Sequence, residues 1–406
     1  MKIFQYISSK YLAAKLLLYR NAMITIKAAK IRKKDNITVV FVLESLSTWK
    51  TESLFQLMVT HKRFNPIILI TYNNAEDDRN ILAQYCQEKG YSHFVETGQK
   101  NEKLWNRFHP DIILYQKPYD GQFTSNLQSL FCYITYGFHA SIEDWSTKTP
   151  LFYNCWQIYY ENATLRKQYA KLLNAKIPNT FATGLPMMDE LLISKNDVPN
   201  QWKSHSHEKK RIIYAPHHSI NPENWWQSAT FLEIGEEILL IAEKYSNQIQ
   251  WAFKPHPLLR YKLNKIWGKD RTDKYYQRWT EMEWSQYEEG KYLGLFKHSD
   301  AMIHDCGSFI LEYLYTGNPV MYLVKDENID SKWNETYQKA YHLHYKAKTK
   351  EEIERFIQNV ISGKDNLKAK REAFMDENLI PPFGQTASQN IIDCILSADK
   401  ASLMQK

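Results

Sequence analysis

The sequence has little of what a disulfide-stabilised, secreted or membrane-spanning protein requires. Its five cysteines, Cys86, Cys132, Cys155, Cys306 and Cys394, are scattered over 406 residues and form no C-x-x-C pair. This favours a reducing compartment and argues against a disulfide scaffold or a structural zinc site. No apolar run approaches the ~20 residues of a membrane-spanning helix, and charges interrupt every apolar stretch near the start, unlike in a signal peptide. We therefore expect a cytoplasmic protein.

Several motifs that define common enzyme classes are also missing. The chain has no G-x-x-x-x-G-K-[ST] loop, no G-x-G-x-x-G after a strand and no G-x-S-x-G elbow. Kinase, dehydrogenase and serine-hydrolase functions therefore lose their best support. No histidine pair has the i, i+4 helical spacing with glutamate that a catalytic zinc helix uses.

Acidic residues are absent from residues 1–34, although this segment carries nine of the chain's 52 basic residues. The rest of the chain is therefore close to neutral against its 45 acidic residues, which argues against a broad nucleic-acid surface. Within the segment, apolar residues at helical spacing alternate with lysines, a pattern that suits an anionic membrane surface. A solvated helix packed on the adjacent domain is an equally good interpretation.

Short apolar strands alternate with amphipathic helices along both halves of the chain. "ITVVFVL" and "IILI" in the first half, and "RIIYA", "IQWAF" and "AMIH" in the second, are typical of such strands. This alternation predicts two doubly wound α/β domains with parallel sheets. We expect the following organisation: a basic amphipathic leader (1–34), an N-terminal domain (35–193), a polar linker (194–210), a C-terminal domain (211–380) and a C-terminal helix (381–406).

Polar residues follow the ends of several expected strands. The four segments are Tyr136 to His139, Ala215 to His218, Lys254 to Pro257, and His304 to Ser308. Ligands of open parallel sheets bind beyond the carboxyl ends of the strands. Two domains that present such edges to one another across a cleft would suit an enzyme with a nucleotide donor and a separate acceptor.

The segment "HDCGSFILE" places small and polar residues at the turn between a strand and a helix. Gly307 would let the backbone approach a ligand, and the N–H groups of the helix start would attract an anion. Ser308 adds a hydroxyl donor, while Glu312, four residues later, would accept hydrogen bonds from a ribose. The plain alternative is that Asp305 or Ser308 caps a buried helix.

Three histidine-bearing turns are candidates for catalysis or donor binding. His256 lies between two prolines and close to Lys254, where it would donate to a phosphate oxygen or act as a general acid or base. A merely structural loop histidine is the alternative. His139 follows a Tyr-Gly turn, from which it would take a proton from an acceptor hydroxyl. Pro216 and His217 lie just past a strand end, although we expect His217 and its neighbour His218 to point to opposite sides.

In their order along the chain, these segments resemble motifs of the CDP-glycerol glycerophosphotransferase family, the teichoic-acid primases and polymerases with a GT-B fold. "YGFHAS" stands where that family has Trp-His-Gly-Thr, and "ATGLPMMDELL" resembles its Gly-x-Pro-Arg-x-Asp-x-Leu segment. "IIYAPHHS" resembles Tyr-Ala-Pro-Thr-Trp, and "FKPHP" its His-Pro motif. "DCGSFILEYL" resembles Asp-Tyr-Ser-Ser-x-x-x-Asp-Tyr, and "GNPVMYL" the strand after it. The match spans roughly residues 130–325.

The chain departs from the family pattern at four positions. Ala140 replaces the glycine after the first histidine, Met187 an arginine, Gly307 a serine and Glu312 an aspartate. The lost arginine and serine would both touch a phosphate-rich ligand. A relative that uses another nucleotide-activated donor would therefore fit these residues nearly as well.

The resemblance implies two Rossmann-type domains, with the acceptor on the N-terminal and the nucleotide donor on the C-terminal one. His139 would be the base that lets an acceptor hydroxyl attack the distal phosphorus of CDP-glycerol and expel CMP. His256 would hold or protonate the diphosphate, Gly307 and Ser308 would stabilise its charge, and Glu312 would bind the cytidine ribose. The remaining donor-side candidates are Lys254, Asp305, Pro216 and His217.

The resemblance also implies no essential metal or cofactor, because GT-B enzymes generally use helix dipoles and side chains instead. The acceptor would be a lipid-linked or polymeric cell-surface glycan, and the protein would be peripheral at the inner face of the membrane. Two alternatives stay open: a GT-B glycosyltransferase that uses a nucleotide-sugar in capsule or lipopolysaccharide synthesis, and a non-catalytic member of a polysaccharide assembly complex.

Overall fold

The computed structural model describes residues 20–71, 76–96, 108–117, 128–141, 152, 154–172, 179–205, 207–221 and 229–405. The chain forms two compact units. The first takes in the chain up to Gly137, residues 143–189 and the C-terminal segment from Pro381. The second takes in residues 138–142 and 190–380. Each contains a parallel sheet with its own buried core, so the two α/β domains predicted from the alternating pattern are confirmed.

The first unit is built on a seven-stranded sheet in the order β3-β2-β1-β4-β5-β6-β7, and all its neighbouring strands run parallel. Its central strands are apolar on both faces, as a sheet covered by helices requires. The order reverses between β1 and β4. The strands are β1 (Ile37–Leu43), β2 (Phe64–Ile70), β3 (His93–Val95), β4 (Ile112–Tyr115), β5 (Leu130–Ile134), β6 (Gln157–Tyr160) and β7 (Thr180–Ala182).

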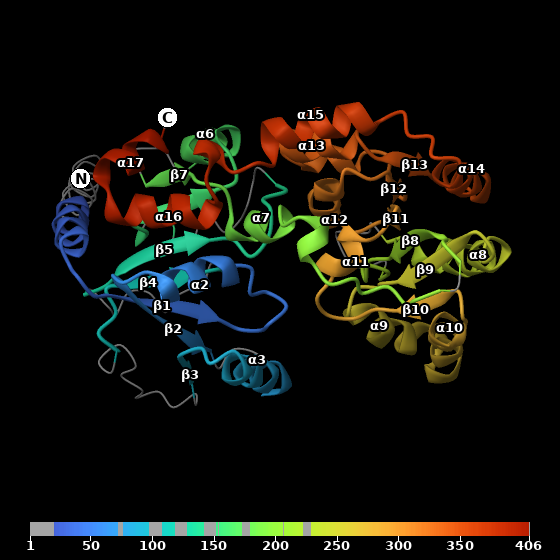
Figure 1. Ribbon diagram of the computed structural model, residues 1–406, viewed down its shortest axis with the longest axis horizontal. Coiled ribbons are helices and arrows are strands. Elements are labelled where there is room, and N and C mark those ends of the chain that lie inside the picture. Colours follow the sequence, from blue (N-terminus) through green and yellow to red (C-terminus); the bar gives the residue numbers. More distant parts are fainter. Residues whose placement is uncertain are drawn as a thin grey trace, which may run out of the picture. The chain divides into compact units, whose positions relative to one another are not determined.

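The helices of the first unit bury one apolar face each. In α2, the buried side chains are Leu54, Phe55 and Met58, which recur at the spacing of one helix face. Ser53 of α2 lies 3.1 Å, oxygen to oxygen, from Ser388 of α16, and Figure 1 shows these two helices side by side. The helices are α2 (Glu52–Thr60), α3 (Glu76–Glu88), α6 (Ala163–Leu172), α7 (Pro186–Leu191), α16 (Ala387–Leu396) and α17 (Ala398–Leu403).

The C-terminal segment returns to the first unit and closes it. The carboxylate of Asp189 accepts hydrogen bonds from the N–H groups of Ala387 (2.6 Å) and Ser388 (2.9 Å), at the start of α16. Gly184 has φ +78°, and a Cβ there would lie 2.9 Å from the Cβ of Ala387. The Gly-x-Pro…Asp motif therefore has a structural task in this chain, namely holding the last helices on the first sheet.

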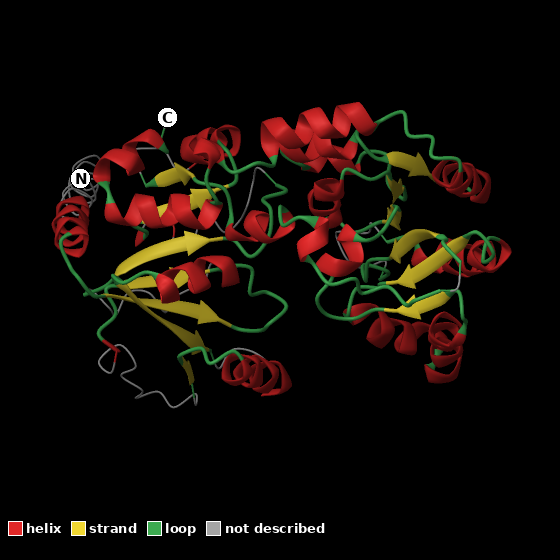
Figure 2. Cartoon of the chain, viewed as in Figure 1, coloured by secondary structure: helices red, strands yellow, loops and turns green. Residues whose placement is uncertain are grey.

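The second unit is built on a six-stranded parallel sheet in the order β10-β9-β8-β11-β12-β13. This is the doubly wound 3-2-1-4-5-6 arrangement, with its switch point between β8 and β11. Figure 2 shows helices on both sides of the strands. The strands are β8 (Lys210–Ala215), β9 (Ile249–Phe253), β10 (Ser285–Tyr287), β11 (Ala301–His304), β12 (Val320–Leu323) and β13 (Tyr345–Ala347).

Aromatic side chains fill much of the second core. Phe253 of β9 stacks on Trp279 with ring centroids 5.1 Å apart, and both side chains are fully buried. Helix α14 begins with a capping box between Thr349 and Glu352 and buries an apolar face on this core. The helices are α8 (Phe231–Lys244), α9 (Leu258–Trp267), α10 (Lys269–Glu281), α11 (Leu293–Lys297), α12 (Phe309–Glu312), α13 (Glu335–Tyr341), α14 (Lys350–Ile361) and α15 (Lys368–Asn378), with short 3₁₀ turns η2 (Lys195–Asp197), η3 (Tyr313–Thr316), η4 (Ile329–Lys332) and η5 (Pro382–Gly384).

The segment expected to be a linker, residues 194–210, is part of the second unit. The chain passes from the first unit to the second between Asp189 and Glu190. Trp202 is buried, and its indole N–H donates to the carbonyl of Leu295 at 2.9 Å. Although the segment is mostly polar, the buried side chain of Trp202 fixes it to the second unit.

The basic leader is described from residue 20 onward, and residues 1–19 lie outside the described part. Residues 20–32 are helical. Ala28 and Ile31 of this helix are buried, and the guanidinium of Arg20 donates to the carbonyl of Cys155 at 3.4 Å. The described portion therefore packs on the first unit. Among the helices of the described ranges, none has the length and apolar character needed to cross a bilayer.

Candidate active site

Three turns meet at the switch point of the second sheet: two contain histidines, and the third contains Gly307. Strand β8 has β9 on one side and β11 on the other, in parallel. The residues that follow them, Pro216 to His218, Lys254 to Pro257 and Asp305 to Ser308, therefore meet at one edge of the sheet. Ligands of doubly wound sheets bind at this place.

The imidazoles of His217, His218 and His256 form a tight cluster at this edge. The ring centroids lie 4.3 Å apart for His217 and His218, 5.0 Å for His217 and His256, and 4.0 Å for His218 and His256. The prediction that His217 and His218 point to opposite sides is wrong, because the chain bends after Pro216 and does not continue as a strand.

Backbone hydrogen bonds between neighbouring strand ends fix these turns. The N–H of His256 donates to the carbonyl of Pro216 at 2.9 Å. The N–H of His217 donates to one carboxylate oxygen of Asp305 at 2.6 Å, while Thr230 donates to the other through its N–H (2.7 Å) and its hydroxyl (3.0 Å). Asp305 is fully buried, and burial raises its pKa to about 6. Its geometry is that of a residue that positions His217.

The imidazoles are held in the neutral form. Burial and the neighbouring histidines and Lys262 lower the pKa of His217 to about 3. Burial, followed by His218 and two lysines, lowers the pKa of His256 to about 3 as well. The pKa of His218 is also lowered, mainly by burial. Near neutral pH the cluster therefore consists of neutral imidazoles and carries no positive charge on its rings.

Lys254 and Glu312 meet on either side of one tyrosine. Tyr292 donates its hydroxyl to the carboxylate of Glu312. The ammonium of Lys254 lies 5.1 Å from the centre of the Tyr292 ring and donates to the carbonyl of Gly290 at 3.2 Å. Both charged residues are less than a tenth exposed. Tyr292 thus connects two predicted donor-side residues, a role that no motif indicated.

The turn from Asp305 to Ser308 differs from the capped-helix alternative. Ser308 makes no side-chain capping hydrogen bond, and the carboxylate of Asp305 is directed to His217 and Thr230. That alternative is therefore wrong. Cys306 in this turn is buried, and burial raises the pKa of its thiol to about 12. Among the residues that the structure describes, no atom would lie within 4 Å of a Cβ placed on Gly307.

His139 lies in a short segment that belongs to the second unit. Asn334, at the N-cap of α13, donates its backbone N–H to the carbonyl of Ala140 at 2.7 Å and its side-chain amide to the carbonyl of His139. The His139 side chain is buried, at 5% exposure. A helix start some 195 residues further along the chain thus fixes the position of this histidine.

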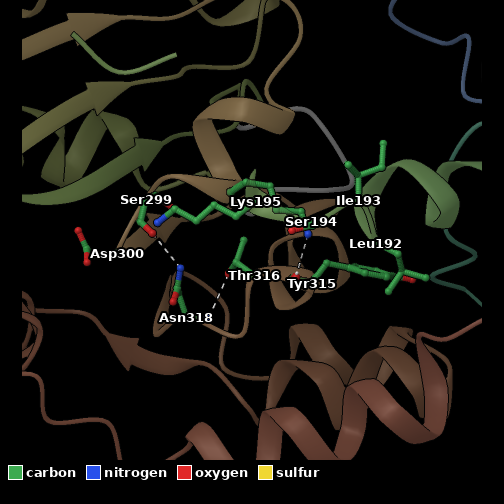
Figure 3. Close-up of a pocket in the computed structure, with 10 residues that line it drawn as sticks. Leu192, Ile193, Ser194, Lys195, Ser299, Asp300, Tyr315, Thr316 and Asn318 are labelled. Carbon is green, nitrogen blue, oxygen red and sulfur yellow. Dashed lines mark hydrogen bonds between the residues drawn. The ribbon is translucent and has the colours of Figure 1, made fainter. Parts of the chain in front are cut away.

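A separate cavity of about 290 Å³ lies at the opposite edge of the second sheet. Asp300 directly precedes β11, and Asn318 lies two residues before β12. Both line this cavity together with Lys297. Figure 3 shows the amide of Asn318 directed toward Ser299, whose carbonyl it contacts at 2.8 Å. The predicted donor-side residues do not line this cavity.

The chain matches a family model over more than half of its length. Residues 148–397 fit the model described as CDP-glycerol:poly(glycerophosphate) glycerophosphotransferase. The chain belongs to this family. It is therefore an enzyme of the CDP-glycerol glycerophosphotransferase family, as its motifs predicted. The match takes in the strand-end segments of the second unit, but it begins after His139.

Solved structures share the fold across nearly the whole chain. A variant of the wall teichoic acid polymerase TagF matches with TM-score 0.64 at 13% identity, covering 98% of each chain. A TagF variant soaked with CDPG matches with TM-score 0.62 at 14% identity, covering 99% and 100%. A putative UDP-N-acetylglucosamine 2-epimerase from Listeria monocytogenes matches with TM-score 0.56 at 15% identity, covering 91% and 97%. At these identities the likeness establishes a GT-B-like fold. No curated protein shows significant sequence similarity to the chain.

Sequence reasoning missed His218, Thr230 and Lys262 at the candidate site. His218 was discounted because an extended backbone was assumed, whereas the preceding Ala-Pro pair was a signal for a turn. Thr230 is the N-cap residue of α8, and Lys262 lies in the middle of α9, where no motif marks it. Only the strand order, with β9 beside β8, shows that they approach the histidines.

Proposed function

We propose that the protein transfers glycerol phosphate, or a related alditol phosphate, from CDP-glycerol to a hydroxyl of a lipid-linked or polymeric cell-surface glycan and releases CMP. The family membership carries the proposal. The donor-side segments gathered at the switch point of the second sheet support it, since this is where such folds bind nucleotides. The TagF variant soaked with CDPG supports the choice of donor.

In the proposed reaction, the acceptor oxygen attacks the distal phosphorus of CDP-glycerol. His139 takes the hydroxyl proton as the P–O bond to the acceptor forms. The bond between the distal phosphorus and the bridging oxygen breaks, and CMP leaves with that electron pair. His256 donates its ring N–H to the departing phosphate, and Glu312 accepts from the cytidine ribose. Asp305 and the Pro216 carbonyl hold His217 and His256 at the diphosphate.

A nucleotide-release assay tests this reaction. Purified protein is incubated with CDP-glycerol, CDP-ribitol and a panel of nucleotide-sugars, with a membrane extract as acceptor. We expect CMP from a CDP-alditol, with loss of release in His139→Ala and His256→Ala. Met187 and Gly307 replace an arginine and a serine of the family pattern. The assay with CDP-ribitol therefore tests whether this chain uses a donor other than CDP-glycerol.

The glycosyltransferase alternative predicts a different product. Transfer of a sugar breaks the bond between the anomeric carbon and oxygen and releases a nucleoside diphosphate, whereas the proposed reaction releases a monophosphate. UDP or GDP appearing from a sugar donor, with no CMP from CDP-alditols, would overturn the proposal and leave the fold unchanged. Absence of turnover with every donor would favour a non-catalytic member of an assembly complex.

The basic leader would bring the enzyme to the membrane on which the proposed acceptor lies. Its lysines would hold the enzyme at an anionic inner leaflet, where a lipid-linked glycan is presented. Co-sedimentation with liposomes that contain anionic lipid should decrease when residues 1–19, which precede the packed helix, are deleted. Unchanged pelleting would argue against membrane attachment through this segment without touching the transfer reaction.

A further inference from the structure

The histidine cluster at the switch point has the composition of a metal site. One ring nitrogen of each of His217, His218 and His256 lies within 4.8 Å of the others. Imidazole is a common zinc ligand, so spacing alone would favour a cation. The hydrogen bonds of the three rings distinguish a site for a cation from a site for an anion.

All three rings use their Nδ1 atoms as hydrogen-bond acceptors. Nδ1 of His256 accepts from the N–H of Leu258 at 3.1 Å. Nδ1 of His217 accepts from the N–H of Ser219 at 3.3 Å and lies 2.9 Å from the hydroxyl of the same residue, which can donate to it as well. Nδ1 of His218 lies 2.8 Å from the ammonium of Lys262, which can only donate. A neutral ring whose Nδ1 accepts carries its proton on Nε2. Each histidine therefore offers an N–H group, and not a lone pair.

This arrangement is the reverse of what a metal requires. A histidine that binds a metal through Nε2 carries its proton on Nδ1 and donates it to an acceptor. Here a metal would have to displace the Nε2 proton and break hydrogen bonds at Nδ1. It would also lie close to Lys262 and to Lys254, two cations. The same N–H groups and ammonium groups attract an anion.

We infer that His218, with Lys262 2.8 Å from its Nδ1, is a second donor to the nucleotide diphosphate beside His256. The identity of the phosphate rests on the proposed function. Lys262 acts through His218: its ammonium fixes the Nε2–H tautomer and polarises the ring, which strengthens the N–H donor. His218 would touch the diphosphate, whereas Lys262 is a positioning residue.

Helix α9 provides a matched control for Lys262. Lys265 lies one turn further along the same helix and is exposed, with its ammonium over the ring of Tyr261 at 4.3 Å. We expect Lys262→Met to weaken binding of CDP-glycerol and of inorganic diphosphate roughly tenfold to a hundredfold. Lys262→Arg should restore most of the affinity. Lys265→Met should bind like the wild type, although the charge change is the same.

Substitutions of His218 separate its ring N–H from a structural role. The amide nitrogen of glutamine reaches about as far as Nε2, whereas that of asparagine corresponds to Nδ1. We therefore expect His218→Gln to keep part of the diphosphate affinity and His218→Asn to lose it. Equal losses, with thermal unfolding of both variants unchanged, would contradict a role for the Nε2–H group.

Isothermal titration with inorganic diphosphate and with zinc chloride alone tests the site independently of turnover. Diphosphate binding that is lost in Lys262→Met supports the inference, and stoichiometric zinc binding lost in His218→Asn overturns it. If CDP-glycerol is turned over with equal KM in wild type and Lys262→Met, the inference fails and the proposed function stands. If diphosphate binds as expected but no CDP-alditol is consumed, the phosphate site stands and the proposed donor is wrong.

Two-bond ¹H–¹⁵N NMR correlations report the imidazole tautomers directly. We expect Nε2–H signals for His217, His218 and His256 in the free protein, assigned by single His→Gln variants. Nδ1–H tautomers for these residues would remove the basis of the inference.

Discussion

The two sheets carry different chemistry at equivalent switch points. Where β1 and β4 end in the first unit, polar groups satisfy one another: Glu44 pairs with Lys117, and the hydroxyl of Ser45 lies 3.0 Å from that of Thr48. Gln116 accepts from the backbone N–H of Lys50 at 3.1 Å. Where β8, β9 and β11 end in the second unit, the imidazoles of His217, His218 and His256 gather with ring centroids 4.0–5.0 Å apart.

This difference indicates which edge is prepared for a charged ligand. An ion pair and a set of paired hydroxyls would have to be broken before the first edge could bind a diphosphate. The second edge already holds neutral N–H donors in fixed positions, so binding costs little rearrangement. This contrast supports the proposal that the donor binds to the second unit, and four experiments test the contrast between the two edges.

The largest effect is expected from removing the proposed catalytic histidines. His139→Ala and His256→Ala should each lower the rate of CMP release by roughly 10² to 10⁴, because proton transfer or charge stabilisation at the diphosphate is lost. His342 is exposed, and its Nε2 lies 3.6 Å from the carboxylate of Asp330. His342→Ala should therefore retain wild-type turnover. Retention of most of the activity in His139→Ala would remove this residue from the base role.

The histidine turns also show how far the sequence could predict the site. The apolar runs around β8, β9 and β11 are strong local signals, and the positions of Lys254 and Gly307 at strand ends followed from them. The partners of Asp305 did not, because Thr230 and His217 are 75 and 88 residues away along the chain. Such contacts follow from strand order, which local patterns do not specify.

The C-terminal segment gives the same lesson at the level of the fold. Its helical pattern predicted a helix, but not that it returns to the first unit, 198 residues from its capping residue Asp189. The motif that contains Asp189 was interpreted through its resemblance to a family segment. Its local sequence carries no information on which helix start the carboxylate reaches.

Removing the buried carboxylate of the second edge should cost far more stability than breaking the ion pair of the first. Asp305→Ala leaves the backbone N–H groups of Thr230 and His217 and the Thr230 hydroxyl without an acceptor, a loss of about 2–5 kcal/mol in free energy of unfolding. Glu44→Gln should cost about 1 kcal/mol or less, since Lys117 is a third exposed. Urea unfolding measures both. Similar losses in the two variants would contradict the contrast in burial.

Acidification should destabilise the second edge through its neutral histidines. His217 and His256 have folded pKa values near 3, below the usual 6.5, so the unfolded chain takes up protons that the folded chain refuses. The free energy of unfolding should fall as pH drops below 6.5, by up to about 2 kcal/mol per histidine at pH 5. The raised pKa of Asp305 has the opposite effect: between pH 6 and 3.8 it increases the free energy of unfolding as the pH falls. This increase comes from one group, whereas two histidines contribute to the decrease.

Unfolding at pH 7 and pH 5 measures this dependence. The double variant His217→Gln/His256→Gln should lose less stability between the two values than the wild type. Lys254, Lys262, His218 and Asp305 are the charged or titratable groups near these rings, and all stay in place in the variant. An unchanged pH dependence would mean that the two histidines already titrate near 6.5 in the folded protein.

The smallest effect on the fold, and the most specific one for the ligand, is expected at Gly307. Its φ is not in the left-handed region, and a Cβ there would have no atom of the described part of the chain within 4 Å. Gly307→Ala should therefore leave the free energy of unfolding unchanged or raise it by about 0.4–1 kcal/mol. If bound CDP-glycerol lies against this turn, the added methyl group should raise the KM for CDP-glycerol, while inorganic diphosphate should still bind the histidines.

Gly317→Ala is the matched control. Gly317 has φ +71° and also has open space beside it, so the substitution should lower stability and leave the KM unchanged. An unchanged KM in Gly307→Ala would place the donor away from this turn and limit the site to the histidine cluster.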